Sequence, residues 1–120
     1  MATVTKELKD RLATSSEIEI SVVGRQTGRR IKVPVWFVLE GDTLYLLPVK
    51  GSDTQWYKNL LQHRRIWISA ADVVGEFDAT PVTDPKIVAS VVKKFRDKYG
   101  ASEVKKYYSK FDVAVVVKIG

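Results

Sequence analysis

The 120-residue sequence contains no cysteine, one methionine and one histidine. Without cysteine there are no disulfide bonds, thiolate metal sites or cysteine nucleophiles. The single histidine, His63, has no spacing to carboxylates that is typical of zinc or iron, so no metal is expected. A Ser-His-Asp triad and a hydrolytic carboxylate pair are equally unsupported. If the protein is an enzyme, a cofactor must therefore supply its chemistry.

Long hydrophobic runs are also absent. Val113–Val117 falls far short of the ~18 apolar residues of a membrane span. Met1–Leu12 is polar and charged, so no secretory signal is expected. The sequence indicates one cytoplasmic domain over residues 1–120 without a transmembrane segment. Peripheral membrane contact through a short amphipathic helix at Thr3–Ala13, with Val4, Leu8 and Leu12 on its apolar face, is left open.

Positive charge is concentrated in the middle of the chain. The net charge is +6, and residues 24–65 hold eight basic and three acidic side chains. Such an excess predicts an anionic partner for this stretch. The alternative interpretation is a basic surface that only confers solubility.

Alternating apolar residues predict about six strands. A hairpin is expected over residues 17–39, strands over 43–47 and 113–119, and a strand pair over 66–71 and 76–82. Helices are expected from Ser52 or Asp53 to about His63, over 85–99 behind Asp84-Pro85 with a stop at Gly100, and from a cap at Ser102 through Tyr108. Because helices do not alternate with strands, a doubly wound parallel sheet is excluded. The expected fold is α+β and mainly β: a small, mostly antiparallel barrel with helices outside.

The segment Pro48–Asn59 is the most informative motif. It predicts the end of a strand, a tight loop carrying Lys50, and the start of a helix carrying Trp56 and Asn59. Free backbone N–H groups at such a corner suit a phosphate, and Trp56 suits a flat ring. Trp56 is also compatible with ordinary core packing. Asn59 is harder to explain as core, because a buried amide needs hydrogen-bond partners.

Two further groups of residues are candidates. The turn Gly24–Arg30 carries Arg25, Arg29 and Arg30, whose guanidinium groups suit phosphate or carboxylate, although a merely soluble hairpin tip fits as well. Tyr99, Tyr107 and Tyr108 are either phenol donors to a substrate oxygen or a packed helix end. Trp36 and Trp67 are expected to be packing residues on strands.

Several motifs occur together in a known order. Gly24-Arg25-Gln26-Thr27-Gly28, Pro34, Gly41-Asp42, Lys50-Gly51-Ser52 and Trp56-Tyr57-Lys58-Asn59-Leu60 resemble the deazaflavin-dependent nitroreductase and quinone reductase family over about residues 18–82. The resemblance implies a split β-barrel related to the pyridoxamine-phosphate oxidases. It also implies the cofactor 8-hydroxy-5-deazaflavin (coenzyme F-420), whose hydride passes to a quinone, nitroaromatic or similar electrophile.

By this resemblance, Arg25 holds the anionic part of the cofactor, Lys50, Gly51 and Ser52 line its phosphate, and Trp56 and Asn59 lie near its ring. Many members have lysine where this chain has Gln26, so Arg29, Arg30 or Lys32 is the expected substitute. The cofactor-binding set is Arg25, Gln26, Lys32, Pro48, Val49, Lys50, Gly51, Ser52, Trp56 and Asn59. The catalytic candidates are Tyr107 and Tyr108.

Two alternative functions stay open from the sequence. An FMN-binding split barrel fits the same phosphate contacts. A basic barrel that binds single-stranded nucleic acid fits the charge, but the aromatic residues follow core-like spacings rather than one exposed strand face. The expected partner is a small-molecule electron acceptor and not a nucleic acid, and the sequence permits a monomer or a homodimer.

Overall fold

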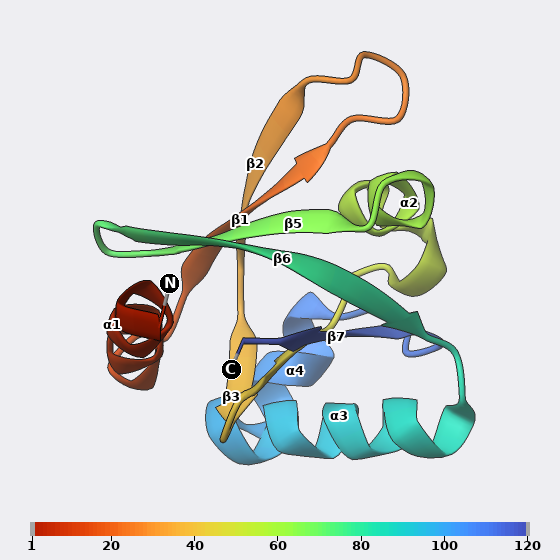
Figure 1. Ribbon diagram of the computed structural model, residues 1–120. Helices are drawn as coiled ribbons and strands as arrows, with labels where there is room; N and C mark the ends of the chain where they lie inside the picture. The colour runs from red at the N-terminus through yellow and green to blue at the C-terminus, as the bar shows by residue number, and fades with distance from the viewer. Residues whose placement is uncertain (1, 120) are drawn as a thin grey trace.

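The computed structural model describes residues 2–119, and side chains from residue 6 onward. Seven strands form one curled, antiparallel sheet in the order β2-β1-β5-β6-β7-β4-β3 (Figure 1). Their bounds are β1 Ile18–Val23, β2 Arg30–Val35, β3 Phe37–Glu40, β4 Thr43–Leu46, β5 Arg65–Ala70, β6 Val73–Val82 and β7 Ala114–Lys118. The expected α+β fold with a mostly antiparallel, curled sheet is confirmed, with one strand more than the sequence indicated.

The additional strand arises from a break at Trp36. The sequence predicted one hairpin arm up to residue 39, because Ile31, Val33, Val35 and Phe37 alternate without interruption. In the structure β2 pairs with β1, whereas β3 pairs with β4 at the opposite end of the strand order. The chain therefore crosses from one sheet edge to the other through a single residue, which requires the sheet to curl.

The long strand β6 joins the two halves of the sheet. Its first part, Val73–Asp78, pairs with β5, and its second part, Ala79–Val82, pairs with β7. Inside the curl the strands bury a core of aliphatic side chains, among them Ile20, Ile68 and Leu44. Burial of such side chains is the main favourable term that holds the sheet closed.

Helices cover the outside of the sheet. The helix α1 (Ala2–Ala13) lies beside β5 and β6 and buries Leu8 and Leu12 in the core, while Val4 lies outside the described side chains. The helices α3 (Pro85–Tyr99) and α4 (Ala101–Tyr107) pack against each other on another side (Figure 1). None of the described helices is long and apolar enough to cross a membrane.

The predicted start of α3 is confirmed. The Asp84 carboxylate accepts a hydrogen bond from the Lys86 N–H at 2.9 Å, and Pro85 occupies the first turn. Gly100 ends the helix with a φ of 97°, a conformation that favours glycine. The buried face of α3 forms a second apolar cluster with α4 and the outer side of the sheet: Val88, Val91, Val92, Phe95, Val104, Tyr108, Leu47, Val38 and Ala114.

The predicted start of the middle helix is wrong by one or two residues. Gly51–Asp53 forms a short 3₁₀ turn, η1, and the helix α2 spans Gln55–Gln62 with Thr54 at its N-terminal boundary. Thr54 Oγ1 accepts a hydrogen bond from the Lys50 N–H at 2.8 Å. This contact turns the chain from the corner into the helix, so neither Ser52 nor Asp53 caps α2.

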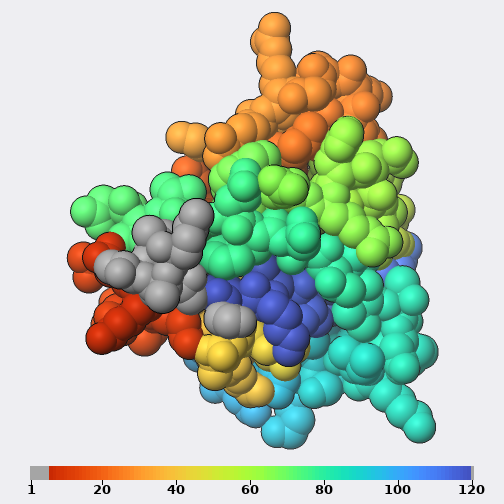
Figure 2. Space-filling view, in the orientation of Figure 1, coloured from red at the N-terminus to blue at the C-terminus, as the bar shows by residue number. Residues whose placement is uncertain are grey.

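The β1–β2 hairpin projects beyond the rest of the sheet, as Figure 2 shows in orange. Its tip carries Arg25 and Arg29, which are exposed. The helix α2 contacts β1 below this hairpin and brings the tip close to the corner after β4.

Candidate functional site

A groove of about 430 Å³ opens where β2, the end of β4, α2 and the end of α4 converge. This volume lies in the range of about 300–1,000 Å³ that is usual for small-molecule sites. The lining residues are mostly aromatic or aliphatic: Glu17, Val33, Pro34, Val35, Trp36, Leu47, Val49, Trp56, Tyr107 and Tyr108. The groove therefore suits a flat apolar ligand.

Sequence analysis missed Glu17, Val33, Val35, Leu47 and, most notably, the aromatic Trp36 as lining residues of this groove. The Trp36 ring stacks on Tyr99 with centroids 4.3 Å apart and planes 9° apart, and it meets the Tyr107 ring edge-on at 5.5 Å. Apolar residues alternate on both sides of position 36, so the sequence pattern indicated that Trp36 was an ordinary packing residue within a strand. The strand break at this residue is what places its ring at the groove.

The tyrosines of the C-terminal part take different roles. The Tyr99 hydroxyl lies 2.7 Å from the Ser16 carbonyl oxygen and accepts from the Phe37 N–H at 3.2 Å, so it ties backbone segments together. Tyr107 and Tyr108 both line the groove. Among the described residues no hydrogen bond occupies the Tyr108 hydroxyl, and burial raises the pKa of this phenol. Tyr108 therefore presents a neutral O–H donor.

The arginine loop of the hairpin docks on α2. The Arg25 backbone N–H and its Nη1 both donate to Asn59 Oδ1, at 3.1 and 2.7 Å, and Nη2 donates to Gln55 Oε1 at 2.7 Å. These acceptors are neutral amides, so they leave the charge of Arg25 uncompensated. A small cavity of about 190 Å³ lies here, lined by Gly24, Arg25, Gln26, Thr27, Ile31, Gln55 and Asn59.

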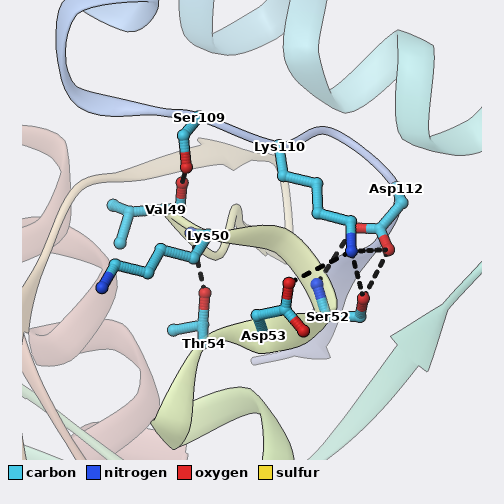
Figure 3. Close-up of polar contacts among 8 residues, drawn as sticks. All are labelled: Val49, Lys50, Ser52, Asp53, Thr54, Ser109, Lys110 and Asp112. Carbon is cyan, nitrogen blue, oxygen red and sulfur yellow. Dashed lines mark hydrogen bonds and ion pairs between the residues drawn. The ribbon is translucent and has the colours of Figure 1, made fainter.

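The turn after β4 that carries Lys50, residues 48–54 and here called the lysine corner, is held by hydrogen bonds to another part of the protein. The Ser52 N–H donates to Asp112 Oδ1 at 2.9 Å, and the Ser52 hydroxyl donates to Asp112 Oδ2 at 2.5 Å (Figure 3). The Lys50 side chain points away from these carboxylates, and no ion pair joins it to another described residue. The acceptor that the sequence suggested for the Ser52 amide, a phosphate, is thus replaced here by Asp112.

The structure brings some of the predicted cofactor-binding residues together and separates others. Arg25, Gln26 and Asn59 share the small cavity, and Val49 and Trp56 line the large groove. Lys50, Gly51 and Ser52 lie at the neighbouring corner, whereas Pro48 and Lys32 line neither cavity. Whether any of them contacts a cofactor stays a prediction.

No group of three or more histidine, aspartate or glutamate side chains within the described part of the chain could hold a metal ion. His63 is exposed at the C-terminal end of α2 and lines neither cavity. The chemistry available at the groove is therefore aromatic packing, phenol donation and, at its neighbours, cationic binding.

Solved structures with this fold have different functions. An F-420-H2 dependent reductase (FDR-A) matches with a TM-score of 0.66 and 18% identity over 86% of this chain and 94% of that chain. A 5-nitroimidazole antibiotic resistance protein of Bacteroides thetaiotaomicron matches at 0.71 and 13%, over 94% and 78% of the two chains. HutZ, the haem storage protein of Vibrio cholerae, matches at 0.69 and 15%, over 94% and 87%.

At these identities the matches show the shared fold alone, and they confirm the resemblance to the deazaflavin-dependent reductases at that level. A search of curated proteins finds no match. The profile of a bacterial family described as "Uncharacterized protein conserved in bacteria (DUF2255)" matches residues 7–119, nearly the whole chain. This chain belongs to the DUF2255 family.

Proposed function

We propose that this chain is a cytoplasmic oxidoreductase that binds coenzyme F-420 and passes its hydride to a quinone, nitroaromatic or similar electrophile. The observation that carries the proposal is the aromatic groove between β2, α2 and α4, with two basic loops beside it. The fold is one that a reductase dependent on this coenzyme also uses.

The groove fits the ring of the cofactor. Trp36 offers an aromatic surface, and Trp56, which is largely buried in the core, lines the groove together with Val33, Val35 and Leu47, an apolar lining that excludes water. Aromatic rings prefer offset or edge-on contacts with one another, which this lining allows. A deazaflavin bound here supplies the hydride, and the chain supplies orientation.

The neighbouring loops fit the anionic part of the cofactor. Arg25 is held by neutral amide oxygens, so its guanidinium remains available as a positive charge next to α2. Lys50, in the corner after β4, is exposed and forms no ion pair with the described residues. Charge-assisted hydrogen bonds from arginine and lysine are the usual means of binding phosphate. Ser52 contacts an anion only where Asp112 is displaced.

Tyr108 is the residue that we assign to the electron acceptor. A tyrosine phenol is protonated at neutral pH and burial raises the pKa of Tyr108 further, so the phenol donates a hydrogen bond and does not act as a base. A donor at a quinone or nitro oxygen stabilises the negative charge that develops there as the acceptor is reduced. Tyr107, at the exposed rim of the groove, bounds the same space.

The competing ligands are FMN and haem. FMN shares the phosphate and the tricyclic ring. Haem is bound by HutZ, a protein of the same fold. Of the residues that usually ligate haem iron, namely histidine, cysteine, methionine and tyrosine, only tyrosines line this groove.

The test is a titration of the purified protein with coenzyme F-420, FMN and haem, followed by tryptophan fluorescence. Trp36 and Trp56 line the groove, so a bound ring is expected to quench their emission. Arg25→Gln is expected to weaken F-420 binding, while Lys93→Gln, at an exposed ion pair on α3 that lines neither cavity, should leave it unchanged. Saturable binding of FMN or haem without binding of F-420 would refute the proposal.

A further inference from the structure

Residues 108–112, five of the six residues between α4 and β7, are here called the strap, and they cross the corner formed by residues 48–54. The Ser109 N–H donates to the Val49 carbonyl oxygen at 2.8 Å, and Lys110 forms a parallel bridge with Lys50. The Lys110 ammonium lies 3.2 Å from Asp53 Oδ2 (Figure 3). The strap is therefore attached to the corner by backbone and side-chain contacts.

Asp112 makes the tightest of these attachments. Its two carboxylate oxygens accept from the N–H and the hydroxyl of Ser52. Burial raises the pKa of Asp112, but the hydrogen bonds from Ser52 and from the Asp112 backbone, together with the nearby Lys110 ammonium, outweigh burial and hold that pKa below its usual value. The carboxylate is thus ionised and doubly bonded at neutral pH.

The approach of Asp112 depends on a glycine. Gly51 has a φ of 54°, and a Cβ atom built there would overlap with Asp112 Oδ1. Any other residue would need both a rare backbone conformation and displacement of the carboxylate. The close approach of Asp112 on the strap therefore requires glycine at position 51 of the corner.

The strap also forms part of the groove. It begins with Tyr108, whose ring is buried beside Trp36, with centroids 6.0 Å apart. Further along, the Phe111 ring stacks with Tyr108 at 6.4 Å. A movement of the strap would therefore move the phenol that faces the groove.

We propose that Asp112 is a positioning residue: by bonding Ser52 it fixes the strap, and thereby the place of the Tyr108 hydroxyl in the groove. The inference rests on the proposed function, in which the groove holds the cofactor and its electron acceptor. The Ser52–Asp112 contact, between residues 60 positions apart in sequence, links the corner that we expect to bind the cofactor with the Tyr108 phenol that we expect to contact the electron acceptor.

The first experiment needs no ligand. The protein is labelled with 3-fluorotyrosine, and the ¹⁹F resonance of Tyr108 is assigned with Tyr108→Phe. Asp112→Ala should shift or broaden this resonance. Asp112→Asn, whose amide can still accept from the Ser52 N–H, should largely restore it. The control Asp97→Ala, which removes an exposed ion pair with Lys93 on α3, should leave it unchanged.

Hydrogen exchange in the same variants gives a second reading. Asp112→Ala should raise exchange at the Ser52 and Ser109 amides by about tenfold or more while α3 keeps its protection. An unchanged Tyr108 resonance together with unchanged exchange would overturn the inference. Loss of protection over the whole chain would overturn it as well, because Asp112 would then support the fold in general.

The second experiment measures the dissociation constant of F-420 in the absence and presence of menadione. Asp112→Ala should reduce the effect of menadione by about fivefold or more, the scale of one hydrogen bond to a polar group, and Asp112→Asn should reduce it less. A wild-type protein that binds no F-420 would refute the proposed function, and the ligand-free experiments alone then decide the role of Asp112. If menadione changes the dissociation constant of F-420 equally in all variants although the Tyr108 resonance is altered, Asp112 does not act by positioning Tyr108.

Discussion

Asn59 Oδ1 accepts two hydrogen bonds from one residue, Arg25, through its backbone N–H at 3.1 Å and its guanidinium at 2.7 Å. Asn59 is buried on α2, and Arg25 lies at the tip of the β1–β2 hairpin. The pair is the contact that fastens the basic hairpin to the helix beside the groove. It also explains how the oxygen of this buried amide is satisfied.

Replacement of Asn59 by leucine should remove this attachment. The change leaves the partly buried Arg25 N–H without an acceptor, so the free energy of unfolding should fall by about 1–3 kcal/mol. Urea unfolding measures this loss. The matched control is Gln55→Leu, which removes one exposed hydrogen bond and should cost less than about 1 kcal/mol. Equal losses in the two variants would show that Asn59 has no special role.

Trp36 should be more important for ligand binding than Trp67, although both are half-buried tryptophans. Trp36 lines the groove, whereas Trp67 on β5 is covered by the Arg30 guanidinium, 3.8 Å from its ring. Trp36→Leu should raise the dissociation constant of F-420 by about tenfold, the scale of one aromatic contact. Trp67→Leu should leave it unchanged. The reverse order, measured by the same titration, would place the ligand elsewhere.

Tyr108 should make stability depend on alkaline pH. Burial raises its pKa above the ordinary tyrosine value of 10.0, so the unfolded chain releases this proton at a lower pH than the folded protein. Stabilisation is therefore complete below pH 10 and falls as pH rises above it. Urea unfolding between neutral pH and alkaline pH should show a steep loss for the wild type. A less steep loss is expected for Tyr108→Phe, and an identical slope would contradict the assignment.

Gly51→Ala should cost more stability than Gly28→Ala. Both glycines have positive φ, 54° and 73°, so each alanine incurs a backbone penalty of about 1–2 kcal/mol. A Cβ at Gly28 meets nothing within 4 Å, whereas one at Gly51 would overlap with Asp112 Oδ1. The difference between the two variants in urea unfolding thus measures the close approach of the strap. No difference would mean that Asp112 moves aside freely.

Local patterns were sufficient for most of the fold. Alternating residues predicted the strands, and Asp84-Pro85 and Gly100 predicted both ends of α3, because these signals act within one turn of chain. The break at Trp36 escaped detection since apolar alternation continues across it and the change of pairing partner depends on distant strands.

Local motifs also identified some residues of the candidate site. Arg25, Asn59, Trp56 and Val49 were chosen from their local motifs, and the structure places them at two neighbouring cavities. The bond between Ser52 and Asp112 joins residues 60 positions apart, so no local pattern contains it. The same applies to the stacking of Trp36 on Tyr99, which links the strand break to the end of α3.

The most direct test of the central claim is a turnover assay. Reduced F-420 is mixed anaerobically with the protein and menadione, and the visible absorbance of the oxidised coenzyme is recorded. The claim predicts that absorbance returns in proportion to the amount of wild-type protein, and far more slowly with Trp36→Leu or Tyr108→Phe. A rate equal to that without protein, under conditions in which FMN or haem binds, would contradict it.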